Sequence, residues 1–142
     1  MDSRLQEVFD SYLKADKQEL ADVGRQAFAN IVGRYAEATN DKETAFAFGM
    51  ACLSTFIVQD NEMAGSEWAF IEYIFQQEMS QDEAFNIIKA SFDKEYYAQI
   101  KEIAEKDDYM KQNICRLGLA VCAIDGSISE DEEAWLAFLI SK

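Results

Sequence analysis

The chain contains no histidine and no proline, and it has only six glycines and three cysteines among 142 residues. The absence of histidine excludes Ser–His and Cys–His nucleophilic pairs, and it removes the imidazole ligands that zinc sites commonly use. Proline breaks helices and punctuates loops, and average usage would place several in a chain of this length. Its absence, with so little glycine, favours helices joined by short turns.

The few cysteines, Cys52, Cys115 and Cys122, all lie within apolar runs. Cys115 and Cys122 fall on one expected helix, where their spacing separates them by about 10 Å along the axis, too far for a disulfide. We therefore expect all three to be small core residues. Such free thiols are typical of a reducing compartment, so we expect the protein to be cytoplasmic.

Basic residues are scarce, with 13 Lys and Arg against 27 Asp and Glu and a net charge of −14. A surface of this sign repels phosphate backbones and anionic lipid headgroups, which argues against nucleic acid and acidic membranes as partners. A divalent cation, or a protein partner with a basic surface, fits the charge better. The identity of that partner and the oligomeric state stay open.

Apolar residues recur at helical spacing almost throughout the chain, without β-like alternation. The two most apolar helices are expected at 42–59 and 110–124, in the centre of the fold. The uncharged part of the first is shorter than the ~20 apolar residues of a membrane span, so no membrane insertion is expected. We predict a single all-α domain, residues 1–142, that forms a compact bundle of about seven to eight helices. Residues 1–41 would form an N-terminal helical extension and residues 42–142 a pseudo-repeat core.

The predicted core contains two pseudo-repeated helix–turn–helix units, offset by 65 residues. The stretch DNEMAGSEWAFIEYIF, which starts at Asp60, parallels DGSISEDEEAWLAFLI, which starts at Asp125. In each copy an apolar helix ends near an Asp, and a Glu follows in the same place, Glu67 in the first copy and Glu132 in the second. Repeated units of this kind can stack to form a shared core.

Helix capping alone accounts for the second turn. Ser129 and Glu132 have the spacing of a capping box, and Gly126 can end the preceding helix with a positive φ. In the first copy Ala64 stands in place of Ser129 and has no side-chain oxygen, yet the Asp and the Glu keep their positions. This difference favours a role for the Asp/Glu pairs themselves.

The functional interpretation of the two pairs is a site for a hard divalent cation, Ca²⁺, Mg²⁺ or Mn²⁺, because carboxylate oxygens without imidazole suit these ions. A standard EF-hand is excluded, since Val121 and Ala123 would occupy its first and third ligand positions. The two turns would instead have to contribute ligands to one common site. The candidate metal ligands are Asp60, Glu67, Asp125 and Glu132.

An apolar helix that ends in AIDG, a short turn with Ile128 and Glu132, and a second such unit about 65 residues away together resemble the TerB-like family. That family includes the tellurite-resistance protein TerB and the N-terminal region of the DjlA co-chaperones. The resemblance covers about residues 42–142. It implies a compact helical fold of two pseudo-repeated halves, cation binding through the four acids, and a link to stress or tellurite response. The first copy departs from the family pattern, because it reads QDNEM where the family favours ADG.

We therefore expect a non-catalytic acidic helical domain that binds a divalent cation. The alternative is a protein–protein interaction module without a bound metal, whose acidic face docks a protein. A third hypothesis is an enzyme that uses paired carboxylates as acid and base in glycoside hydrolysis. No substrate-binding signature accompanies the acids in support of it.

Overall fold

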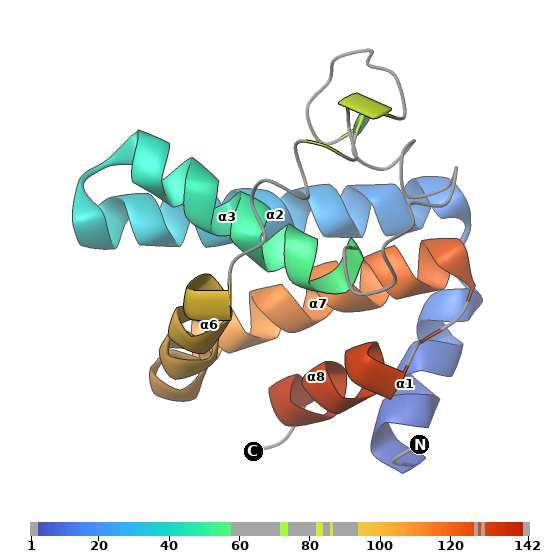
Figure 1. The fold of residues 1–142 in the computed structure, drawn as a ribbon. Helices are drawn as coiled ribbons and strands as arrows, with labels where there is room; N and C mark the ends of the chain where they lie inside the picture. The colour runs from blue at the N-terminus through green and yellow to red at the C-terminus, as the bar shows by residue number, and fades with distance from the viewer. Residues whose placement is uncertain are drawn as a thin grey trace.

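The computed structural model describes residues 3–57, 72–73, 82–83, 86, 94–126, 128 and 130–140. Within these residues the chain is all-helical, with six helices and no strand, which confirms the predicted fold class (Figure 1). The full count of seven to eight helices and the pseudo-repeat involve residues outside these ranges and stay predictions. The helices are α1 (Ser3–Leu13), α2 (Lys17–Thr39), α3 (Lys42–Ile57), α6 (Lys94–Lys106), α7 (Asp108–Asp125) and α8 (Glu130–Ile140).

Helix α7 is the centre of the bundle. Each of the other five helices packs against it, α2 and α3 on one side and α1 and α8 on another (Figure 1). Every residue from Leu117 to Ile124 is buried. A helix that is apolar on all sides can be surrounded in this way without leaving charges unsolvated. The prediction of a central helix over 110–124 is confirmed.

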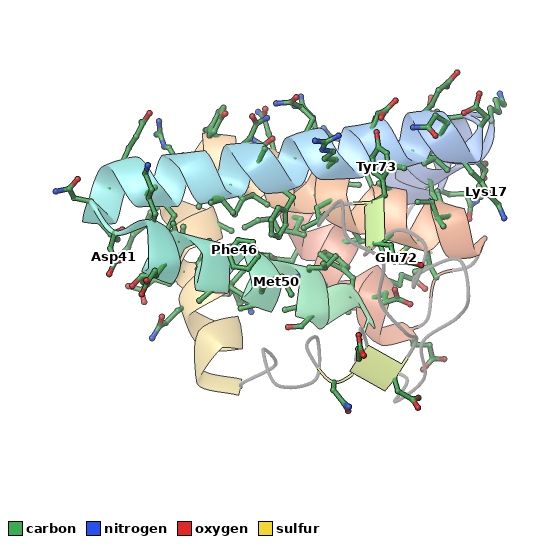
Figure 2. The ribbon with its side chains drawn as sticks, turned by 90° about the horizontal axis from the view of Figure 1, so that it is seen from above. Lys17, Asp41, Phe46, Met50, Glu72 and Tyr73 are labelled. Carbon is green, nitrogen blue, oxygen red and sulfur yellow. The ribbon has the colours of Figure 1, made fainter. Side chains whose placement is uncertain are left out.

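Helices α2 and α3 form an antiparallel hairpin, which Figure 2 shows from above. The turn is made by Asn40, whose left-handed φ of 56° ends α2 and whose N–H donates to the carbonyl of Ala36 at 2.7 Å. The next residue, Asp41, accepts hydrogen bonds from the backbone N–H groups of Glu43 and Thr44 at 3.1 and 3.2 Å. An αL residue followed by an N-cap lets one helix end and the next begin within two residues.

The uncharged stretch of the sequence forms the core helix α3. All residues from Phe48 to Phe56 are buried, including Cys52. On one side Phe48 stacks on Tyr35 of α2, with ring centroids 4.3 Å apart. None of the described helices combines the length and the apolar character that crossing a membrane requires.

Polar contacts fix α2 against α7. The Asn30 amide donates to the side-chain oxygen of Asn113 at 3.0 Å, and Asn113 is buried. Asp107 caps α7 by accepting from the backbone N–H of Tyr109, and it also pairs with Arg34 at 3.0 Å. Because these contacts depend on both the position and the rotation of the two helices, they specify how α2 lies along α7.

Helix α3 packs closely on α7 at Gly118. A Cβ placed on this glycine would lie 2.3 Å from the Phe56 ring, far inside van der Waals contact. The Phe56 ring lies in turn 6.5 Å from the ring of Trp135 in α8, centroid to centroid. The missing side chain of Gly118 therefore makes the space that the Phe56 ring occupies.

We expect Gly118→Ala to destabilise the fold by about 1–3 kcal/mol, because the added methyl overpacks a buried contact. A matched control is Gly33→Ala, since a Cβ on this α2 glycine meets nothing within 4 Å. That substitution should stabilise the fold by about 0.5–1 kcal/mol through helix propensity alone. Urea unfolding followed by circular dichroism measures both, and equal changes in the two variants would contradict the packing argument.

Candidate functional site

The turn between α7 and α8 begins as the sequence predicts. Gly126 has a left-handed φ of 86°, and its N–H donates to the carbonyl of Cys122 at 2.8 Å. A residue with a side chain is rarely found in this conformation, so glycine is what allows α7 to end abruptly here. The predicted C-cap at Gly126 is confirmed.

Glu132 lies in the first turn of α8, and its side chain is buried, with 7% of the residue exposed. Its carboxylate faces α7, where the thiol of Cys122 donates a hydrogen bond to it at 3.0 Å. A carboxylate in such a position is costly unless it is partnered. The acid is therefore held inside the hairpin and not on its solvent surface.

The end of α3 reaches the same region of the molecule. The indole N–H of Trp135, one turn after Glu132, donates to the hydroxyl of Thr55 at 3.1 Å, and both residues are buried. Helix α3 ends two residues later, at Ile57. The last turn of α3 therefore lies beside the second turn of α8.

Of the four predicted metal ligands, Glu132 has a described side chain. Asp125 is the last residue of α7, but the orientation of its side chain is outside the description, and Asp60 and Glu67 lie outside the described residues altogether. Among the residues that the structure describes, no three His, Cys, Asp or Glu side chains form a cluster that can hold a metal. The common site remains a prediction.

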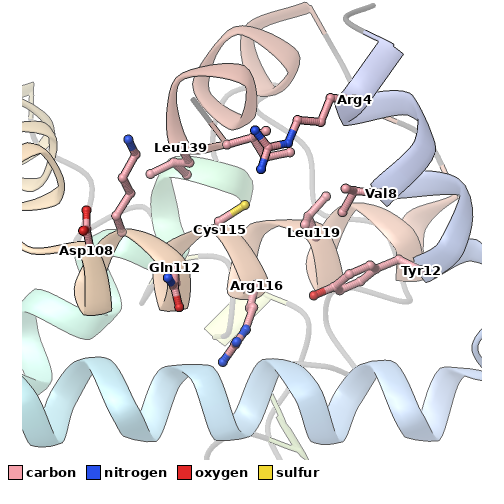
Figure 3. A pocket seen from close by; sticks show the side chains of 11 residues that line it. Arg4, Val8, Tyr12, Asp108, Gln112, Cys115, Arg116, Leu119 and Leu139 are labelled. Atoms are coloured by element: carbon pink, nitrogen blue, oxygen red, sulfur yellow. The ribbon is translucent and has the colours of Figure 1, made fainter. Parts of the chain in front are cut away.

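A second candidate site was not predicted from the sequence. It is a cleft of about 600 Å³ between α1, α7 and α8, shown in Figure 3. The cleft contains three basic side chains, Arg4, Lys111 and Arg116, and one acid, Asp108. Its apolar lining is formed by Val8, Leu119, Leu139 and Ile140.

The thiol of Cys115 lines the middle of this cleft, as Figure 3 shows. Burial raises the pKa of this thiol to about 11, while Arg116, Lys111 and Arg4 each act to lower it. The pKa of Tyr12, another lining residue, is also raised by burial. Both groups are therefore neutral at pH 7.

One signal for this cleft was present in the sequence. Arg4, Val8 and Tyr12 recur every four residues, which places them on one face of α1. Val8 and Tyr12 are half-buried at the margin of the core, and Arg4 continues the same face toward solvent. The periodicity indicates a shared face but not the helix that the face meets.

No protein-family model matches the chain, and neither a curated protein nor a solved structure matches it. The resemblance to the TerB-like family therefore stays a prediction that depends on the residues of the two turns. Function has to be argued from the geometry and charge of the sites themselves.

The raised pKa of Cys115 predicts unusual alkylation kinetics, because the thiolate is the reactive form. The rate with iodoacetamide should rise about tenfold per pH unit from pH 8 to pH 10, whereas an ordinary thiol levels off above its pKa of about 8.5. Peptide mapping by mass spectrometry would follow Cys115, with glutathione as the reference thiol. A rate for Cys115 that levels off near pH 9 in the folded protein would show that burial does not control it.

Proposed function

We propose that the protein is a non-catalytic helical domain, similar to the TerB-like family, that binds a divalent cation. The ligands would come from the segment after α3 and from the turn between α7 and α8. In this proposal Asp60, Glu67, Asp125 and Glu132 supply oxygen ligands to Ca²⁺, Mg²⁺ or Mn²⁺. A stress or tellurite response, in a reducing compartment, is the role that the resemblance suggests.

The observation that carries the proposal is the hydrogen bond between Trp135 and Thr55. It joins the last turn of α3 to α8, and Phe56 adds an aromatic contact with the same indole. The last turn of α3, which Asp60 and Glu67 follow in the sequence, is therefore close to the helix that contains Glu132. This proximity supports a common site, because a ligand set drawn from both turns requires the two to meet.

The burial of Glu132 is the second support. An exposed acid at the start of α8 would be explained by the helix dipole alone, and Glu130 is such an acid. Glu132 is different, since its carboxylate turns inward to the thiol of Cys122. An inward carboxylate close to other acids would be stabilised by a cation, which offsets both desolvation and mutual repulsion.

Cation binding predicts a change in thermal stability. After chelation, addition of the bound ion at 100 times its dissociation constant should stabilise the fold by about 2.7 kcal/mol. For a chain of this length that corresponds to a rise in Tm of roughly 10 °C. Glu132→Gln should abolish the ion-dependent rise, whatever its effect on the Tm without ion. Glu130→Gln, an exposed acid in the same turn of α8, is the matched control and should retain it.

Calcium, magnesium and manganese would each be tested by differential scanning calorimetry. If none of the three raises the Tm of the unmodified protein, the cation proposal is wrong and the interaction module without metal takes its place. If an ion raises the Tm equally in Glu132→Gln, then that ion binds elsewhere on the acidic surface.

A further inference from the structure

A second cavity, of about 510 Å³, is lined by residues of α1, α2 and α7. Its volume is within the range of small-molecule sites. Helix α2 contributes three polar side chains at one-turn spacing, Asp22, Gln26 and Asn30. Tyr12 of α1 and Arg116 of α7 also line the cavity, and Figure 3 shows Arg116 extending toward α2. Polar groups therefore reach this cavity from all three helices.

A row of hydrogen-bonded amides forms the inner part of the cavity. Asn113 is 1% exposed, and its side-chain oxygen accepts from the Asn30 amide at 3.0 Å, while its own amide donates to the carbonyl of Tyr109 at 2.8 Å. The Gln26 amide donates in turn to the side-chain oxygen of Asn30 at 2.9 Å. Because each amide is held by the next, the hydrogen-bonding groups along this row have fixed orientations.

Two opposite charges line the same cavity, Asp22 from α2 and Arg116 from α7. Within the part of the chain that the structure describes, no ion pair joins them, and Arg116 has no ion pair or side-chain hydrogen bond to another residue. Gln18 and Tyr73 both donate to Oδ1 of Asp22, which leaves Oδ2 outside the hydrogen bonds with described residues. The guanidinium and one carboxylate oxygen can therefore bind a ligand without breaking a contact of the fold.

The hydroxyl of Tyr12 adds a neutral polar group beside Arg116. Burial raises the pKa of Tyr12, and the charge of Arg116 acts to lower it, so the guanidinium is within electrostatic reach of the hydroxyl. Among the described residues, none forms a hydrogen bond with this hydroxyl. A guanidinium and a hydroxyl that are near each other can together donate to the two oxygens of one carboxylate.

We propose that this cavity binds a free α-amino acid whose side chain both donates and accepts hydrogen bonds, such as glutamine. The carboxylate pairs with Arg116 and accepts from Tyr12, and the ammonium group pairs with Asp22. Asp22 repels an anion that has no ammonium group, and Arg116 repels a cation that has no carboxylate, whereas a zwitterion satisfies both. Gln26 and Asn30 offer amide groups of both kinds to the side chain of the ligand.

A structural explanation competes with this proposal. Asp22 and Arg116 are both exposed, so water alone is able to solvate their charges. The hydrogen bond between Asn30 and Asn113 holds α2 against α7 whether or not a ligand is present. Neither role gives affinity for an amino acid, so a binding measurement separates the two explanations.

Isothermal titration calorimetry of the full chain with L-glutamine tests the proposal. The buffer contains EDTA, so that the result does not depend on the cation site proposed above. We expect saturable binding of one glutamine per chain, with a dissociation constant of about 1 mM or lower. The absence of saturable binding would overturn the proposal and would leave the cation proposal unaffected.

Two variants test the charged groups. Arg116→Gln and Asp22→Asn should each weaken glutamine binding about tenfold, which corresponds to the loss of a charge-assisted hydrogen bond. Asp10→Asn is the matched control for Asp22, because Asp10 also accepts from a glutamine four residues earlier but does not line the cavity. Lys42→Gln removes an exposed cation of α3 outside the cavity. Both controls should change the affinity less than about twofold, since distant charges are screened.

Two analogues of glutamine test which charge meets which residue. Glutaramate lacks the ammonium group and γ-aminobutyramide lacks the carboxylate, so each should bind at least about tenfold more weakly than glutamine. Asp22→Asn should strengthen the binding of glutaramate, because it removes the repulsion between two carboxylates, although it weakens the binding of glutamine. A structural role of Asp22 would not produce this change of sign. Equal affinity for glutamine and glutaramate, or unchanged glutamine affinity in Arg116→Gln, would contradict the proposal.

Discussion

The fold depends on a helix that requires no contact with water over its second half. From Leu117 to Ile124 every residue of α7 is buried, and the five other described helices pack around α7. Burial of this apolar surface is the dominant favourable contribution to the free energy of folding, at about 25 cal/mol per Å². This packing also requires a glycine at position 118, because the Phe56 ring occupies the space that a side chain there would need.

Both candidate sites follow from the antiparallel packing of α8 on α7. At the turn end of this hairpin Cys122 meets Glu132, and at the other end Cys115 and Leu139 line the same cleft. If α8 were rotated about its own axis, the Cys122–Glu132 hydrogen bond and the position of Leu139 in the cleft would both change. The thiols are therefore core residues, as predicted, and Cys115 and Cys122 lie at the two candidate sites.

Helical periodicity was sufficient to predict that the described residues are all-helical and that α7 is central. The left-handed conformation of Gly126 was also predictable, because a glycine directly after an apolar helix has few other roles. The burial of Glu132 against Cys122 was not predictable, since it depends on how α8 crosses α7 and not on spacing along the chain. The predicted ligands Asp60 and Glu67 lie outside the described residues, so the hypothesis of a common metal site stays a prediction.

The cleft could not be predicted from the sequence, for a related reason. Arg4 belongs to a segment that was expected only to extend the core, and the other two bases that line the cleft, Lys111 and Arg116, are more than 100 residues away in the chain. The repeat of Arg4, Val8 and Tyr12 predicts one face of α1, but the docking of that face on α7 is a long-range event. The composition did not indicate the cleft either, because a net charge of −14 does not show where in the fold the 13 basic residues lie.

The two sites have opposite charge, and the length of α7 keeps them independent. Lys111 and Asp125 are on the same helix, and at about 1.5 Å per residue their backbones are roughly 20 Å apart. This exceeds the screening length of about 8 Å at physiological ionic strength. Cations at one end therefore do little to neutralise acids at the other. The basic residues that line the cleft and the acids near the turn therefore act on their surroundings separately.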